Sequence, residues 1–396
     1  MKTRIPQKQF IAIVFQAFFL LFFLAAINLS YVSKELEINE PDRFAIYTRY
    51  LFFIVSLLVI ALNVNRLKFK GIHLICILWF MFMFPALFYS GAMLQVYSHC
   101  LMWPVVFEAM YFLILDGQKV LKSFRTLFIP VFIVGIIYFF RASFLTNFGI
   151  QTNMVFYAIL CFPWLLLYKS KSIKLIFMIL ITLLALLSMK RSMMLIVAFF
   201  WAILGIYILF SSSNKIIASI IFVFVLGGSF LVFNYVDDFL GGSLSARFEE
   251  NEDEKGGGRK DIYEATGLLI ISSSWNDLII GHGHHAVARD SILEHSAHND
   301  FMEIIYDYGL VEFVVYLSLW VYLFKKMFFL VKIKSKYRIS YFASLSCFIV
   351  MSTISHLVLY ANYFLFLVMY WAAIEALIPH CKHMKKGKGK QAILNT

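Results

Sequence analysis

The chain has 396 residues, of which 61% are hydrophobic and 15% are charged, and its formal net charge is +12. A soluble domain of this length needs far more polar surface, so the composition excludes a soluble globular protein and predicts an all-α polytopic membrane protein. The positive charge at first suggests nucleic acid as a partner. We exclude that partner because the basic residues follow the alternation of membrane loops.

Apolar windows of about 20 residues are long enough to cross a hydrocarbon core, because a helix rises about 1.5 Å per residue. The first window continues to about Asn28 without a small-residue cleavage site, so we expect an uncleaved span and not a signal peptide. Pro85, Pro104 and Pro163 fall inside predicted spans, where we expect them to mark kinks. About twelve spans are predicted, near residues 10–29, 44–63, 72–89, 96–115, 127–144, 152–168, 173–189, 192–211, 216–236, 311–331, 340–357 and 360–379.

The charges of the connecting segments alternate along the chain. With twelve spans, both termini lie on one side, and that side holds 24 of the 35 Lys and Arg residues, whereas 20 of the 23 acidic residues fall on the other. The positive-inside rule therefore predicts cytoplasmic termini. The predicted organisation is spans one to nine within 1–236, a periplasmic loop over 237–310, spans ten to twelve within 311–380, and a basic cytoplasmic tail over 381–396 near anionic lipid.

Four basic residues oppose this charge pattern. Lys190 and Arg191 lie in the short connection SMKRSMM, which is expected outside, and Arg49 and Arg141 lie near the outer ends of spans two and five. Such residues cost desolvation energy, so another interaction should offset them. For Arg49 and Arg141, contact with lipid headgroups or loop acids explains their position equally well. For Arg191 the loop position favours a function.

The predicted periplasmic loop holds five of the ten histidines of the chain. The segment RKDIYEATGLLIIS, which begins at Arg259, predicts a short amphipathic helix on the outer membrane face. The turn GHGHH follows, and its glycines, Gly281 and Gly283, allow a tight bend or close approach of a ligand. Asp300 and Glu303 have the spacing of a capping box and predict a helix start there.

The order of these features resembles the O-antigen polymerase and O-antigen ligase superfamily of bacterial surface-polysaccharide assembly. The features are the short connection with Arg191, the loop arginine entering a helix, the Gly-x-Gly turn, the His298-Asn299 pair and the downstream Gly309. The resemblance covers the topology and roughly residues 185–325. It implies a multi-pass protein of the bacterial inner membrane.

The resemblance also implies metal-independent, inverting glycosyl transfer on the periplasmic face, with no cofactor. The expected function is polymerisation of oligosaccharide repeat units, with donor and acceptor both carried on undecaprenyl diphosphate and a chain-length regulator as a further partner. Arginines stabilise the charge that gathers on a departing diphosphate, and a histidine takes the proton of the attacking hydroxyl. The predicted catalytic residues are His298, Arg259 and Arg191, and the predicted substrate-binding residues are Arg247, Arg141, Lys190, Asn299, Gly281 and Gly283.

Several alternatives stay open from the sequence. A ligase would use the same chemistry with the lipid A core oligosaccharide as acceptor, and a flippase would transport the same lipid-linked glycan. His295 with His298, or the GHGHH turn, could in principle hold zinc. Glu108 lies inside the fourth predicted span, where a carboxylate is either functional or paired with Arg or Lys at a helix interface.

Overall fold

The computed structural model describes residues 7–35, 43–89, 93–115, 118–145, 153–214, scattered positions between 216 and 245, and 259–393. Every element in these ranges is helical and none is a β-strand, which confirms the all-α prediction. The first ten α-helices are α1 (Gln7–Glu35), α2 (Arg43–Ala61), α3 (Ile72–Tyr89), α4 (Leu94–Cys100), α5 (Met102–Leu115), α6 (Gln118–Leu145), α7 (Val155–Ile159), α8 (Phe162–Leu165), α9 (Lys171–Leu187) and α10 (Arg191–Ser211).

The second half of the chain adds short helices before the last long ones. These elements are α13 (Arg259–Ser272), α14 (Trp275–Ile280), α15 (Ala286–Asp290), α16 (Asp300–Glu303), a π-helical turn (Ile304–Tyr308), α17 (Gly309–Lys332), α18 (Arg338–Ile354) and α19 (Ala361–Ile393). The helix predicted for the segment that starts at Arg259 is present as α13.

Within the described ranges, six helical segments are long and apolar enough to cross a membrane. They are Gln9–Val32, Arg43–Ala61, Lys119–Leu145, Arg191–Ser211, Asp300–Lys332 and Ala361–Ile378. Shorter apolar helices occupy other predicted spans. The ninth predicted span, 216–236, falls largely outside the described residues. A multi-pass helical membrane protein is therefore confirmed, and the total of twelve spans stays a prediction.

The prolines divide into two structural classes. Pro85 lies inside the continuous helix α3, as expected for a kink. The kink prediction is wrong for Pro104 and Pro163. They lie in the first turns of α5 and α8, each of which follows a short non-helical interruption. Proline lacks a backbone N–H and is tolerated best in the first turn of a helix, so a new helix begins at these two positions.

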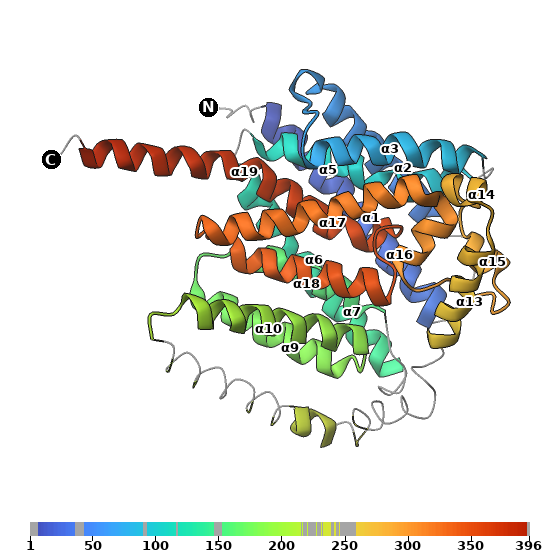
Figure 1. Cartoon of the computed structure of the whole chain (residues 1–396). Coiled ribbons are helices and arrows are strands. Elements are labelled where there is room, and N and C mark those ends of the chain that lie inside the picture. The colour runs from blue at the N-terminus through green and yellow to red at the C-terminus, as the bar shows by residue number, and fades with distance from the viewer. Residues whose placement is uncertain are drawn as a thin grey trace.

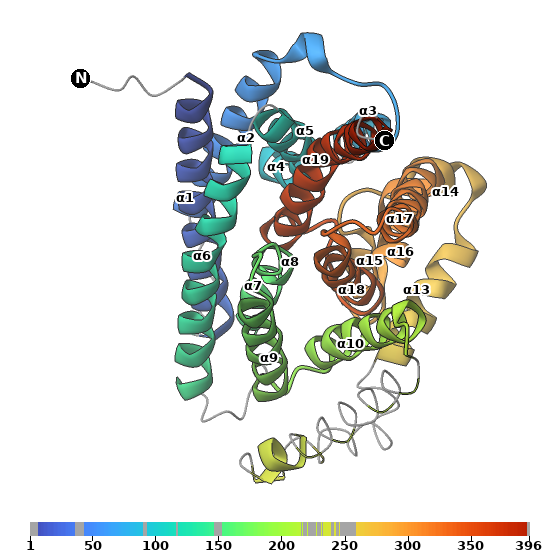
Figure 2. The ribbon, with the colours of Figure 1, turned by 90° about the vertical axis from the view of Figure 1, so that its left-hand side faces the viewer.

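The bundle is built around α19. Of its apolar segment Ala361–Ile378, 83% is buried, and α19 packs closely against α5. Aromatic rings fill the space between α19 and its neighbours, where the indole of Trp164 stacks on Phe128 with ring centroids 4.4 Å apart and Phe366 lies beside Phe128. Figure 2 shows α1 and α6 along one side of the bundle, α17 and α18 on the other, and α19 between them.

The buried charge in the fourth predicted span has a partner. Glu108 lies 2.8 Å from Nδ1 of His73, and both side chains are almost completely buried. The expected partner was Arg or Lys, and the observed one is a histidine of α3. This pairing offsets the cost of burying the carboxylate and explains Glu108 without a catalytic role.

The helices α13, α14 and α15 gather at one end of the bundle, as Figure 1 shows, and the C-terminal part of α19 extends beyond the opposite end. The connection that contains Lys190 reaches the same end as α13, and so does the connection between α18 and α19. Segments far apart in the sequence therefore meet there, as the alternation of the predicted spans requires.

A close approach of two backbones fixes the turn after α14. Gly281 has φ +90° and Gly309 has φ +86°, and a Cβ atom on Gly281 would lie 2.6 Å from Cα of Tyr308. The next two N–H groups of the turn donate to the carbonyl oxygens of Tyr306 and Asp307 at 2.9 and 2.8 Å. Only glycine fits here, because any side chain would meet backbone atoms in a conformation that other residues rarely adopt.

We expect Gly281→Ala to destabilise this end of the molecule by roughly 1–3 kcal/mol, because it adds backbone strain and a steric clash. Gly267→Ala is the matched control, since Gly267 lies in α13 with open space around it. Thermal melting of the purified variants measures the effect. Equal melting temperatures for Gly281→Ala and the wild type would show that the turn tolerates a side chain.

Candidate active site

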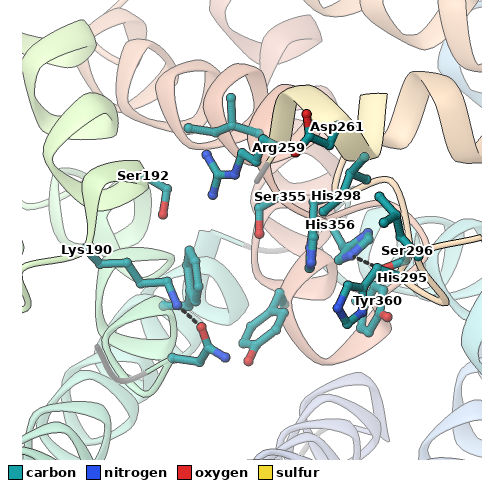
Figure 3. A pocket seen from close by; sticks show the side chains of 16 residues that line it. Lys190, Ser192, Arg259, Asp261, His295, Ser296, His298, Ser355, His356 and Tyr360 are labelled. Atoms are coloured by element: carbon teal, nitrogen blue, oxygen red, sulfur yellow. Dashed lines mark hydrogen bonds between the residues drawn. The ribbon is translucent and has the colours of Figure 1, made fainter. Parts of the chain in front are cut away.

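A cavity of about 710 Å³ opens at the end of the bundle where α13, α10 and the α18–α19 connection meet. Figure 3 shows its lining side chains pointing toward a common space. The lining comes from five separate parts of the chain and comprises Asn153, Phe156, Lys190, Ser192, Arg259, Asp261, Ile262, Leu293, His295, Ser296, His298, Ile354, Ser355, His356, Tyr360 and Tyr363.

Two cations form one side of the cavity. Arg259 is the first residue of α13, and its guanidinium points into the cavity toward Ser192 (Figure 3). Lys190 precedes the first residue of α10, and its ammonium group donates to Oδ1 of Asn153 and lies 4.9 Å from the ring centroid of Phe156. The positive end of the α10 helix dipole lies on the same side. This wall suits an anion with several oxygen atoms.

Two of the other predicted arginines, Arg191 and Arg141, are not among the residues that line this cavity. Arg191 follows Lys190, is half-buried, and is absent from the lining of the cavity. Arg141 lies at the end of α6, where its guanidinium stacks 4.9 Å from the ring centroid of Tyr31. Arg247 lies outside the described residues. Of the predicted cationic residues, the structure therefore brings Arg259 and Lys190 together.

His298 faces these cations from the other side of the cavity, just before α16 (Figure 3). Its backbone is in the left-handed region, with φ +51°. The next residue, Asn299, caps α16, because its Oδ1 accepts from the N–H of Phe301 at 2.9 Å and its Nδ2 donates to the carbonyl of Thr353 at 3.0 Å. Asn299 therefore fixes the position of His298. It also caps the helix, which was the role predicted for Asp300 with Glu303.

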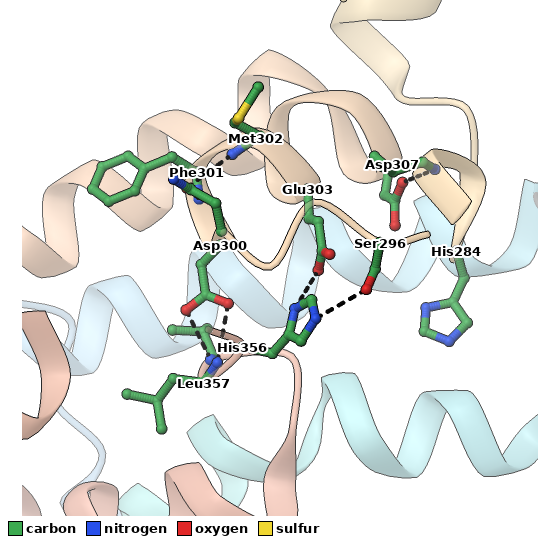
Figure 4. Close-up of polar contacts among 12 residues, drawn as sticks. His284, Ser296, Asp300, Phe301, Met302, Glu303, Asp307, His356 and Leu357 are labelled. Carbon is green, nitrogen blue, oxygen red and sulfur yellow. Dashed lines mark hydrogen bonds and ion pairs between the residues drawn. The ribbon is translucent and has the colours of Figure 1, made fainter. Parts of the chain in front are cut away.

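Asp300 binds the backbone of the connection between α18 and α19. The prediction that its side chain caps a helix is wrong. Its buried carboxylate accepts from the N–H groups of Leu357 and Val358, both at 3.1 Å (Figure 4). These two bonds fix the backbone directly after His356. The α18–α19 connection is therefore attached to the loop that carries His298.

His356 is a site residue that the sequence reading missed. Its Nε2 lies 3.0 Å from Oγ of Ser296, and its Nδ1 lies 3.0 Å from a carboxyl oxygen of Glu303 (Figure 4). Its ring centroid is 4.5 Å from that of His298. The signal in the sequence was a histidine near the outer end of the predicted span 340–357.

The histidines of the GHGHH turn contact tyrosines next to the cavity. The ring of His282 stacks on Tyr306 at 4.0 Å, and Nδ1 of His284 lies 2.5 Å from the hydroxyl of Tyr308. Burial lowers the pKa of His284 to about 3 and also lowers the pKa of His285, so both imidazoles are neutral near pH 7. In the part of the chain that the structure describes, no group of three His, Cys, Asp or Glu side chains is placed to hold a metal ion.

Gly281 and Gly283, which were predicted to bind substrate, instead shape the turn after α14. Gly281 contacts the start of α17, and Gly283 donates its N–H to Asp307. Neither glycine lines the cavity. Their contribution to the site is to place α15 and the segment that leads to His298.

A second hollow of about 620 Å³ adjoins the first. It shares four residues with the cavity, His295, Ser296, His298 and Tyr360, and continues to His285, Ala288, Arg289 and Glu294. Arg289 is held by Asp290, with 2.7 Å between Nε and the carboxylate. His298 therefore lies where a cationic cavity and a more open polar hollow meet.

The fold and the site together define a multi-pass helical membrane protein with a cationic, histidine-containing cavity at one end of its bundle. Residues 175–317 match the family described as O-antigen ligase, which confirms the resemblance to the O-antigen polymerase and ligase superfamily. The match supports polymerase or ligase activity in broad terms. A comparison with curated proteins found no match. The matched stretch supplies Lys190, Arg259 and His298, whereas Asn153 and His356 come from outside it.

Proposed function

We propose that this protein polymerises oligosaccharide repeat units carried on undecaprenyl diphosphate, by inverting and metal-independent glycosyl transfer on the periplasmic face of the bacterial inner membrane. The observation that carries the proposal is the arrangement of one cavity, in which Arg259 and Lys190 face His298. An anion-binding wall opposite a proton-accepting group is what transfer from a diphosphate to a hydroxyl requires.

The donor diphosphate binds at Arg259 and Lys190. As the bond between the anomeric carbon and the phosphate oxygen breaks, its electron pair leaves with the diphosphate, and negative charge grows on the phosphate oxygens. The planar guanidinium of Arg259 offers paired N–H donors to two of these oxygens, and the ammonium of Lys190 adds a compact charge. Both groups stabilise the transition state more than the ground state and so accelerate departure.

The acceptor sugar binds in the second hollow. Arg289, Glu294 and Ser296 offer polar groups for sugar hydroxyls there, and His298 lies at the junction with the donor cavity. The acceptor oxygen attacks the anomeric carbon from the side opposite the diphosphate, which inverts the configuration, and its proton passes to an imidazole at the junction. His298 contacts the acceptor hydroxyl in this arrangement, as its orienting group or its base.

A ligase is the second candidate, and the description of the matched family favours it. The two functions share the donor and differ in the acceptor, which for a ligase is the lipid A core oligosaccharide. Deletion of the gene separates them. Polymerase activity predicts lipopolysaccharide with a single repeat unit and no long chains, whereas ligase activity predicts complete loss of repeat units with free lipid-linked polymer.

We expect the deletion strain to show the single-repeat pattern and the restored gene to return the long chains. Gel analysis of lipopolysaccharide and of extracted lipid-linked glycan provides both readouts. Loss of all repeat units from the lipopolysaccharide in the deletion strain, with single lipid-linked repeat units retained in the cytoplasmic leaflet of the membrane, would favour transport and contradict the proposal.

A further inference from the structure

Large apolar side chains are exposed on two short helices that lie outside the long apolar spans. On α13 the exposed fractions are 67% for Leu268 and 82% for Ile271, and on α14 Trp275 is 76% exposed and Ile279 and Ile280 are exposed as well. Single apolar residues are common on protein surfaces, whereas a group of them usually marks a surface that another molecule covers. We call these five residues the apolar corner.

The exposed face of α13 changes in character along the helix. It is formed by residues three or four positions apart, which are Lys260, Glu264, Leu268 and Ile271. This spacing places their side chains on one face of a helix. The first two side chains form an exposed ion pair, and the last two are apolar. One helix face therefore has a charged first half and an apolar second half.

The apolar residues that hold α13 against the protein are different ones. Ile262 lines the cavity, and Leu269 and Ile270 pack against the small buried cluster that includes Val287. The amphipathic pattern predicted for α13 is therefore used in part for contacts inside the protein. The exposure of the apolar corner needs a separate explanation.

The apolar corner continues into the exposed side of a membrane span. A Cβ atom on Gly309 would lie 2.4 Å from the carbonyl oxygen of Ile279, so α14 ends against the start of α17. The first turns of α17 expose Val311 and Val314, and α17 belongs to a segment that is long and apolar enough to cross a membrane. Figure 2 shows α13 and α14 at the rim of the bundle on the side of α17, away from α1 and α6. Lipid that surrounds the start of α17 is therefore the nearest cover for the apolar corner.

We infer that the apolar corner is embedded in the membrane leaflet nearest the cavity, at the boundary between headgroups and acyl chains. Trp275 suits this boundary, because an indole combines an apolar ring system with a polar N–H. The charged first half of α13 then lies among the headgroups, as in other helices that lie along a membrane surface. Arg259, the first residue of α13, is thereby held at the depth of the diphosphate of a lipid-linked substrate, and this last step rests on the proposed function.

Fluorescent labels measure the depth of the apolar corner without any need for activity. Cysteine replaces Leu268, Ile271 or, as the control on the same helix face, Lys260, and each cysteine carries an environment-sensitive dye. Four native cysteines are buried, and Cys381 is replaced by serine in every variant. The full chain is placed in nanodiscs with or without lipids that carry a doxyl quencher near the top of the acyl chain. We expect blue-shifted emission and strong quenching at positions 268 and 271, and emission typical of water with weak quenching at position 260.

Two results would overturn the inference. Emission typical of water at positions 268 and 271 would show that the apolar corner is not embedded in lipid and would favour a protein partner as its cover. Blue-shifted emission without quenching would place protein, and not acyl chains, around the labels. Both results are independent of glycan transfer, so they are distinguishable from a failure of the proposed function.

A charge in the apolar corner tests the link to the substrate. Ile271→Glu places a carboxylate among acyl chains, so we expect the second half of α13 to leave the membrane and KM for the lipid-linked substrate to rise several-fold, with a smaller change in kcat. Ile271→Val is the matched control and should keep the wild-type KM. An unchanged KM in Ile271→Glu would show that membrane contact of α13 does not set the depth of Arg259.

Discussion

Replacement of Arg259 by alanine is expected to lower the rate of glycan transfer by about 10²–10³-fold, the usual effect of removing one group that stabilises transition-state charge. The guanidinium points into the cavity from the first turn of α13 and faces Lys190, so its loss removes the paired donors for the departing diphosphate. In cells, the variant should make no long chains although its protein level stays near that of the wild type.

Lys260→Ala is the matched control for this experiment. Lys260 is the next residue of the same helix, but its side chain is 60% exposed and pairs with Glu264 at the surface. Arg259→Lys should give an intermediate rate, because lysine keeps the charge and loses the planar pair of donors. Long chains retained in Arg259→Ala would remove the leaving-group role from this residue.

Replacement of His298 is expected to lower the transfer rate by about 10²–10⁴-fold, while the lipid-linked donor still binds. The imidazole lies at the junction of the two hollows, on the acceptor side of the cationic wall. Its loss should therefore affect the acceptor hydroxyl and spare the diphosphate contacts. Donor binding and transfer are measured separately on the same purified protein.

The backbone of His298 determines which substitution is informative. With φ +51°, alanine adds strain of its own, whereas asparagine adopts this conformation more readily and cannot act as a base. His298→Asn should thus melt near the wild-type temperature and still fail in transfer. Full activity in His298→Asn would leave His298 without a role in the reaction.

The features that the sequence predicted are those with local signals. Apolar windows of about 20 residues indicated the membrane helices, because a helix crosses the bilayer when it is both long enough and apolar enough. Lys190 was found because it opposes the charge pattern of the loops, and α13 was found from its periodicity after Arg259. His298 was found through the order of short motifs in the loop. Each of these signals is present in the order of residues along the chain and does not depend on which segments meet in space.

The features that were missed depend on which segments meet in space. Nothing near His356 in the sequence indicates that Glu303 approaches it from another loop or that Asp300 binds the backbone beside it. The contact between Gly281 and Gly309 likewise joins two segments that are distant in the sequence, so Gly281 was interpreted as a substrate-binding residue. The cavity itself exists only because α7, α10, α13 and the α18–α19 connection converge.

Incubation of the purified protein with undecaprenyl-diphosphate-linked repeat units as the only substrate tests the central claim most directly. The measured quantity is the distribution of glycan chain lengths on the lipid. The account predicts a ladder that grows by whole repeat units with release of undecaprenyl diphosphate, insensitive to EDTA and absent from Arg259→Ala. Unchanged chain lengths with the wild-type protein, or an identical ladder with Arg259→Ala, would contradict it.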